Sequence, residues 1–148
     1  MNLIAWSQNM TPDAAKSAGA ILVSKDQLFE RADILTIHLV LSSRTRGLVG
    51  AAELQRMKPT ARLINASRGP IVDEQALISA LKSRQIAGAA TDVFDTEPLP
   101  PSHPFRTLDS VLATPHIGYV SAGLYKMFYE DTVSNIRKWL DTQMEGNG

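Results

Sequence analysis

The sequence predicts an α/β protein in which parallel strands form a sheet flanked by helices. Short apolar runs alternate with segments of helical pattern along the whole chain, and this order is typical of parallel sheets. Charged or polar side chains follow several of these runs directly, at the loops where open α/β sheets carry their reacting groups. The length of 148 residues, with 44% hydrophobic and 20% charged residues, suits one domain with a sizeable core.

Six short apolar runs, each bounded by polar or turn-forming residues, are the expected strands. Their approximate positions are 3–6, 20–23, 34–38, 62–66, 86–91 and 111–113. The fifth run consists mainly of small residues, which suits close packing under a bound molecule. The ends of the last three runs are the places where we expect chemistry.

Helix-start and helix-stop signals predict five helices between and after these strands. The first helix is expected to begin near residue 11, and the other four are expected near 25–31, 51–57, 74–83 and 121–140. Ser24 and Gln27 have the spacing of a capping box, Pro59 stops the third helix, and Asp73 caps the fourth. Apolar residues form a stripe on the last helix at Leu124, Phe128, Ile136, Trp139 and Leu140. Residues 145–148 are expected to be disordered.

Three side chains at the strand ends suit the reduction of a small 2-keto acid. Arg68 has the planar, forked cation that grips a carboxylate through two bonds. His116 is suited to give a proton to a carbonyl oxygen and to take it back, because imidazole titrates near neutral pH. Glu97 is expected to hold the His116 tautomer and to favour its protonated form.

Each of these residues also has a plain structural interpretation. An Arg at a strand end is often a solvated charge, a Glu before proline is often a loop carboxylate, and His116 could cap the following helix. The occurrence of all three in one order favours the chemical interpretation. His38 and His103 lack such a context, and we assign His38 to packing and His103 to the loop surface.

Three motifs carry a resemblance to a known family. They are Ile-Asn-Ala-Ser-Arg-Gly-Pro-Ile-Val-Asp-Glu at 64–74, Gly-Ala-Ala-Thr-Asp-Val-Phe-Asp-Thr-Glu-Pro at 88–98, and Ala-Thr-Pro-His-Ile-Gly at 113–118. Together they resemble the NAD-binding domain of the D-isomer-specific 2-hydroxyacid dehydrogenases, over about residues 2–140. The resemblance implies a Rossmann-like fold and an NAD(P)-dependent oxidoreductase that acts on the CH–OH group of 2-hydroxy acids.

The resemblance also implies roles for individual residues. Arg68 would bind substrate, Glu97 would pair with the catalytic histidine, and His116 would be the acid/base. Asp92 would contact the nicotinamide carboxamide. Further residues would line the nicotinamide half of the cofactor through their backbone, namely Ala66, Ser67, Arg68, His116 and Gly118.

The choice between NAD and NADP depends on the end of the second strand of a dinucleotide-binding unit, which in this sequence is the apolar run at 3–6. An acidic residue there usually binds the ribose 2′-hydroxyl of NAD, whereas a missing acid with a nearby Arg accommodates the 2′-phosphate of NADP. Ser7 stands at this position and is neither acidic nor basic. The sequence therefore leaves the cofactor open, with an inclination to tolerate NADP.

The Gly-rich turn that cradles the cofactor pyrophosphate does not occur in the 148 residues. We expect the first strand and this turn to precede Asn2, so that residues 1–148 form a partial dinucleotide-binding domain of a truncated enzyme. Such a chain is expected to bind cofactor weakly and to show no steady turnover alone. The alternative is a truncated, non-catalytic module for dinucleotide binding or protein assembly.

Composition and charge limit the kinds of binding partner that we expect for this chain. Fifteen basic and fifteen acidic residues give a formal charge of zero, which argues against nucleic acid as a partner. The sequence has no cysteine, which is compatible with a cytoplasmic enzyme, and it indicates no metal site and no membrane segment. A homodimer is expected, because the strands beside the missing one and the apolar stripe of the last helix need partners.

Overall fold

The computed structural model describes residues 1–145, in two compact units that divide after His116. The first unit holds every strand, and the second begins at Ile117.

The strands form two parallel sheets in the first unit. Their bounds are β1 Ile4–Ala5, β2 Ile21–Leu22, β3 Ile34–Ile37, β4 Arg62–Asn65, β5 Gly88–Thr91 and β6 Val111–Ala113. Strands β1 and β2 pair with each other, and the other four pair in the order β3-β4-β5-β6, all in parallel. The parallel α/β architecture confirms the predicted Rossmann-like class.

The helices begin where the sequence signals predict. Their bounds are α1 Pro12–Ser17, α2 Lys25–Arg31, α3 Ala51–Arg56, α4 Glu74–Lys82 and α5 Ala122–Glu145. Ser24 and Gln27 form the predicted capping box before α2. The Asp73 side chain accepts from the Ala76 amide at the start of α4, as predicted.

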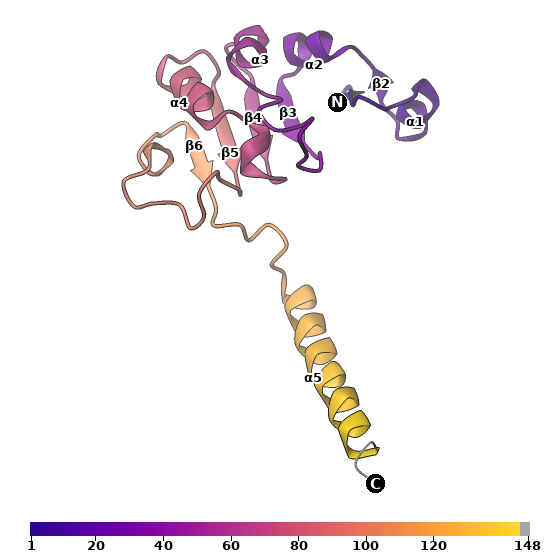
Figure 1. The fold of residues 1–148 in the computed structure, drawn as a ribbon. Helices are drawn as coiled ribbons and strands as arrows, with labels where there is room; N and C mark the ends of the chain where they lie inside the picture. Colours follow the sequence, from indigo (N-terminus) through magenta and orange to yellow (C-terminus); the bar gives the residue numbers. More distant parts are fainter. Residues whose placement is uncertain (146–148) are drawn as a thin grey trace. The chain divides into compact units, whose positions relative to one another are not determined.

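The core of the first unit lies between the four-stranded sheet and helices α2, α3 and α4, which follow one side of the sheet in Figure 1. Alternate residues of β3 and β4 point into this core, and Leu35, Ile37 and Leu63 are almost fully buried. The opposite face is less covered, since Ile34 and Leu112 stay exposed. The core therefore fixes one face of the sheet, and with it the direction of the loops that follow the strands.

Two short 3₁₀ turns were not predicted, Gly69–Ile71 and Pro104–Arg106. The first follows Arg68 directly, and the second ends the proline-rich loop between β5 and β6. Helix α5 runs to Glu145, five residues past the predicted end. Most of the segment expected to be disordered, residues 146–148, lies outside the described residues.

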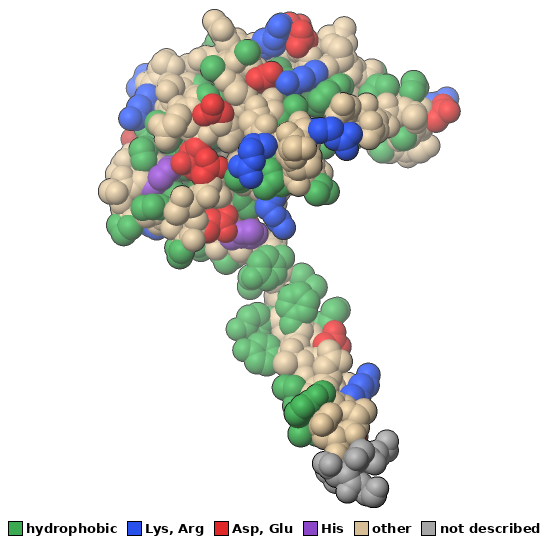
Figure 2. Space-filling view, in the orientation of Figure 1, with side chains coloured by type: hydrophobic (Ala, Val, Ile, Leu, Met, Phe, Trp, Pro, Cys, Tyr) green, Lys and Arg blue, Asp and Glu red, His purple; other side chains and the backbone are tan. Residues whose placement is uncertain are grey.

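Helix α5 makes up most of the second unit, and within this unit most of its side chains are exposed. Figure 2 shows hydrophobic side chains along the helix. The large exposed ones are Tyr125, Met127, Phe128, Tyr129, Val133, Ile136, Trp139 and Leu140. In the described part of the chain, no helix is long and apolar enough to cross a membrane.

Candidate active site

Parallel register brings the ends of three strands to one edge of the sheet. Asn65 of β4 pairs with Thr91 of β5, and Thr91 pairs with Ala113 of β6. The loops that carry the predicted side chains start at this level, because the strands run in the same direction. Arg68, Asp92 and His116 follow these three neighbouring strands within three residues of their ends.

The Arg68 loop is shaped by Asn65, a buried side chain that the sequence interpretation missed. The Asn65 amide donates to the Arg68 carbonyl at 3.0 Å and accepts from the Ser67 amide at 3.1 Å. The Ser67 hydroxyl donates to the Leu39 carbonyl at 2.5 Å, which ties the loop to the end of β3. Arg68 itself is exposed, and its guanidinium bonds the Ser67 carbonyl at 2.6 Å. The backbone is thus held while the charged group faces solvent.

His116 has a backbone conformation that is rare outside glycine. Its φ of 57° lies in the left-handed region, where a side chain costs about 1–3 kcal/mol and is seen mainly at sites of function. The His116 amide donates to the Thr114 carbonyl at 3.0 Å, which closes a tight turn after β6. The turn directs the imidazole toward the loop after β5, where Nδ1 lies 2.8 Å from Oε2 of Glu97.

Glu97 receives two bonds and the influence of one further charge. Its Oε1 accepts from the Phe94 amide at 2.9 Å, while Oε2 meets His116. The bond with His116 and the Phe94 amide lower the pKa of Glu97, and the positive charge of Arg68 lowers it further. The structure therefore brings Arg68, Glu97 and His116 into one electrostatic group. Both partners of the ion pair are more than a third exposed, so the site is open to a ligand.

Asp92 lies at the same edge of the sheet, directly after β5, and is 8% exposed. Its amide donates to the Asn65 carbonyl at 3.0 Å, and its carboxylate accepts from the Thr114 hydroxyl at 2.5 Å. These bonds link the ends of β4, β5 and β6. Asp92 is thus fixed between the loops of Arg68 and His116.

Ser7 lies in a separate cavity of about 280 Å³ in the first unit. The lining residues are Trp6, Ser7, Gln8, Asn9, Leu39, Val40, Ser42, Arg44, Thr45 and Leu48. They include apolar side chains, hydroxyls and one cation, but no carboxylate. Leu39 links the two regions, since it lines this cavity and its carbonyl accepts from Ser67 of the Arg68 loop.

Arg44 is carried on a turn with its own hydrogen bonds. The Thr45 hydroxyl donates to the Val40 carbonyl at 2.7 Å and accepts from the Ser42 amide at 2.8 Å. Within residues 1–145, Arg44 forms no ion pair with a carboxylate. Its charge is available to a ligand in the Ser7 cavity. The sequence interpretation missed Arg44, which no motif separates from the other exposed arginines.

The assignments of His38 and His103 were wrong. His38 is exposed, because it follows an edge strand, and its ring lies 3.0 Å from the Thr36 hydroxyl. His103 is the packed histidine, since its side chain is only 12% exposed and its Nε2 lies 2.9 Å from Oε1 of Glu74. The 3₁₀ turn after His103 folds this part of the loop back onto the core.

The other predicted cofactor-binding residues lie in two different parts of the chain. Ala66 is exposed and Ser67 half-buried in the Arg68 loop. Gly118 belongs to the second unit, which begins one residue earlier. In the described part of the chain, no three His, Asp or Glu side chains come together as metal ligands.

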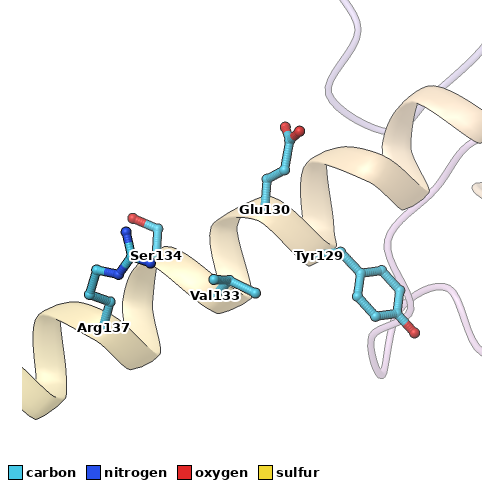
Figure 3. Close-up of a pocket in the computed structure, with 5 residues that line it drawn as sticks. All are labelled: Tyr129, Glu130, Val133, Ser134 and Arg137. Atoms are coloured by element: carbon cyan, nitrogen blue, oxygen red, sulfur yellow. The ribbon is translucent and has the colours of Figure 1, made fainter.

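A larger concavity of about 400 Å³ lies on α5 (Figure 3). Its lining residues are Tyr129, Glu130, Val133, Ser134 and Arg137. All project from a single exposed helix, and Tyr129 and Glu130 point to different sides of it. The concavity lacks opposing walls, so we assign it no ligand.

Comparison with known proteins gives the family. Residues 1–118 match the family described as D-isomer specific 2-hydroxyacid dehydrogenase, NAD binding domain. The match contains all three motifs that carried the resemblance, and it confirms the predicted family and the predicted kind of cofactor.

Relatives and solved structures agree with this match. The chain is 45% identical over 118 residues to D-3-phosphoglycerate dehydrogenase of Synechocystis sp., covering 80% of this chain and 21% of the relative. It is 52% identical over 92 residues to glyoxylate reductase of Thermofilum pendens, covering 62% of this chain and 27% of the relative. The crystal structure of phosphoglycerate oxidoreductase from Vibrio cholerae superimposes with a TM-score of 0.86 at 33% identity, covering 96% of this chain and 46% of that one.

Proposed function

This chain belongs to the D-isomer specific 2-hydroxyacid dehydrogenases. We propose that the intact enzyme of which it forms part, loaded with cofactor and called the holoenzyme below, interconverts a small 2-keto acid and the matching 2-hydroxy acid, with NAD or NADP as hydride carrier. The observation that carries this proposal is the 2.8 Å contact between His116 Nδ1 and Glu97 Oε2. Arg68 acts on the same carboxylate through its charge. A cation, an acid/base and its carboxylate partner are the groups that this reaction needs.

Arg68 is proposed to bind the substrate carboxylate. Its backbone is held by Asn65, and among the described residues its guanidinium bonds one partner, the neighbouring Ser67 carbonyl. A bidentate bond to a carboxylate would replace that bond with a stronger, charge-assisted pair. The position of the substrate carbonyl is then set relative to His116.

His116 is proposed to move the proton. With Nδ1 donating to Glu97, the opposite ring nitrogen, Nε2, carries the proton that passes to the carbonyl oxygen during reduction. A bound nicotinamide would supply the hydride for the carbonyl carbon, so that hydride and proton together would convert the 2-keto acid into the 2-hydroxy acid. Glu97 stabilises the positive imidazole that must form before each reduction.

The residues present fit the two ends of a dinucleotide. We propose that Asp92, Ala66, Ser67, Arg68 and His116 hold the nicotinamide end, and that the Ser7 cavity takes the adenosine end. The cavity's apolar side chains suit an adenine ring, and its hydroxyls suit a ribose. Leu39 connects the two ends, as a continuous ligand would require.

We further propose that the cofactor is NADP. Ser7 provides no carboxylate to bind a ribose 2′-hydroxyl or to repel a phosphate, and Arg44 lines the same cavity without an acidic partner in the described chain. A phosphate would give Arg44 a charge-assisted partner. These features favour the phosphorylated cofactor.

Two small nucleotides test this choice on the purified chain, because 2′,5′-ADP differs from 5′-AMP only in the 2′-phosphate. Calorimetric titration is expected to give about tenfold tighter binding of 2′,5′-ADP, as a charged hydrogen bond is worth roughly 1.5–3 kcal/mol. Arg44→Ala should remove the difference, whereas Arg46→Ala, outside the cavity lining, should keep it. Equal binding of both nucleotides would contradict the NADP choice and leave the cofactor site intact.

The activity itself is tested in the holoenzyme with Arg68→Ala. The variant should lose 2-keto acid reduction, with glyoxylate and hydroxypyruvate as probes, while its cofactor affinity changes less. Arg62→Ala is the matched control, because Arg62 is exposed at the opposite end of the same strand. Equal activity of the two variants would contradict the role of Arg68.

Three broader proposals remain from the sequence. We propose that residues 1–148 are part of one dinucleotide-binding domain, that the protein is cytoplasmic, and that it forms a homodimer. The exposed apolar side chains of α5 support the dimer and also favour the second candidate function, a non-catalytic assembly module. An active holoenzyme that loses activity with Arg68→Ala would exclude that second function.

A further inference from the structure

Glu74 bonds both ends of the loop that carries Glu97. It is the first residue of α4, and its Oε1 lies 2.9 Å from Nε2 of His103. Its Oε2 accepts from the Asp95 amide at 3.4 Å. Asp95 stands two residues before Glu97, and His103 stands six residues after it. One carboxylate therefore closes the loop of residues 95–103.

The two bonds of Glu74, to His103 and to the Asp95 amide, form a clamp on this loop. The His103 end of the clamp packs against the core. The Phe105 amide donates to His103 Nδ1 at 3.2 Å, which leaves Nε2 as the ring nitrogen that donates to Glu74. The ring of Phe105, itself 4% exposed, lies edge-on to the His103 ring at 4.8 Å. The side chains of Glu74 and His103 are only 15% and 12% exposed, so water weakens this pair less than it weakens the pair of Glu97 and His116.

The Asp95 end lies beside the bond that orients Glu97. The Phe94 amide donates to Glu97 Oε1, and the next amide along the chain, that of Asp95, donates to Glu74. Two consecutive amides thus bind two carboxylates. Any displacement of the Asp95 amide from Glu74 would move the Phe94 amide and loosen its hold on Glu97.

The clamp is not arranged for greatest stability. Burial and the Glu74 carboxylate both raise the pKa of Asp95, and Asp73 adds a further negative charge nearby, while Arg46 and His103 act in the opposite direction. A third carboxylate at this place is therefore electrostatically unfavourable.

We propose that Glu74 and His103 are positioning residues, which hold the loop between β5 and β6 so that Glu97 meets His116. This inference rests on the proposed acid–base role of Glu97 and His116. It assigns a function to a histidine and a glutamate that do not contact the reacting groups.

The test uses NMR on the purified chain and needs neither cofactor nor turnover. The first readout is the pKa of the Glu97 carboxyl group, which lies below its usual value as long as His116 and the Phe94 amide hold it. The second readout is hydrogen exchange of the Phe94 amide at neutral pH. Glu74→Ala is expected to raise the Glu97 pKa toward its usual value and to speed Phe94 exchange by about tenfold or more, as for a locally opened loop.

The sign of the pKa change separates positioning from simple charge loss. Removal of a negative charge alone would lower the pKa of the remaining carboxyl groups. A rise in the Glu97 pKa therefore reports that Glu97 has left its partners. An unchanged or lowered Glu97 pKa, with unchanged Phe94 exchange, would overturn the proposal.

Glu53→Ala is the matched control. Like Glu74, Glu53 bonds one side chain, Lys25 at 2.7 Å, and one backbone amide, Gly50 at 3.0 Å, and its side chain is 22% exposed. It lies at the start of α3 and should affect stability without affecting either readout. Equal effects of both variants on the Glu97 pKa would reduce Glu74 to a merely structural role and overturn the proposal.

A milder variant covers the case in which Glu74→Ala does not fold. Glu74→Gln replaces one of the two accepting oxygens by an NH₂ group, so His103 Nε2 and the Asp95 amide can no longer each bond a separate oxygen. Phe94 exchange in this variant should lie between that of the parent chain and that of an open loop. Phe94 amide exchange identical to that of the parent chain would overturn the proposed clamp. Failure of the proposed enzyme function would appear in a different experiment, the holoenzyme assay with Arg68→Ala.

Discussion

At the scale of single residues, the site depends on side chains that bind backbone as much as on side chains that face the ligand. Asn65 folds the Arg68 loop by bonding both Ser67 and Arg68. His116 takes a left-handed backbone that directs its ring to Glu97. The proposed reacting groups are therefore exposed, but the backbone that carries them is fixed.

Asp95 gives a prediction on stability and pH. Burial and the Glu74 carboxylate raise the pKa of Asp95, so its ionised form is disfavoured in the folded chain. Above the raised pKa, Asp95→Asn should increase the free energy of unfolding, by less than about 1 kcal/mol because solvent screens the charges. The gain should shrink as the pH falls through the raised pKa and vanish below the usual value of 3.8, where Asp95 is protonated in both states.

Urea unfolding at neutral and at acidic pH measures this difference. Asp109→Asn is the control, since Asp109 is an exposed loop carboxylate outside the cluster. A gain that is equal at both pH values would contradict the electrostatic explanation for Asp95.

At the scale of elements, the sequence predicted local structure well and distant pairing poorly. The capping box at Ser24 and the Asp73 cap depend on neighbours within three residues, and both are present. The pair of Glu74 and His103 joins residues 29 positions apart, and no local pattern could reveal it. The sequence therefore predicted Arg68, Glu97 and His116 as candidate site residues through their strand-end motifs, but it missed the side chains that hold the loops.

Two loops of the site approach each other at Gly69. A Cβ atom at this position would collide with the Phe94 carbonyl group and lie 2.7 Å from the Asp95 amide nitrogen. Gly69→Ala should therefore destabilise the first unit by about 1–3 kcal/mol, as for other overpacked sites. Urea unfolding provides the measurement.

Gly123→Ala is the control for this substitution, because a Cβ atom there meets nothing within 4 Å. In the helix it should be neutral or stabilising by about 0.5–1 kcal/mol. Equal effects of the two substitutions would show that the loops of Arg68 and Glu97 are not in close contact.

At the scale of the whole molecule, several surfaces expose apolar groups or unpaired backbone. In the described chain, β1 pairs only with β2, and β3 pairs only with β4, so each has one edge without a strand partner. Ile34 on β3 is 61% exposed. Such edges and the apolar side chains of α5 are typical of surfaces that bind protein.

We expect a homodimer in which α5 contributes to the interface. Phe128→Glu combined with Trp139→Glu should shift the chain to monomer, because both side chains are exposed and apolar on α5. Lys126→Ala on the same helix should leave the dimer intact. Light scattering on dilute samples decides between these states, and a monomeric parent chain would show that the apolar surfaces need no second copy.

In the proposed reaction, His116, held by Glu97, moves the proton during 2-keto acid reduction. The decisive measurement is the steady-state kcat/KM of the holoenzyme with glyoxylate and NADPH, compared between the parent and His116→Ala. A lost acid/base is expected to lower kcat/KM by about 10²- to 10⁴-fold, whereas Glu97→Gln should mainly shift the pH profile. If His116→Ala retained kcat/KM within about tenfold of the parent, His116 would not be the proton donor and the proposed mechanism would be wrong.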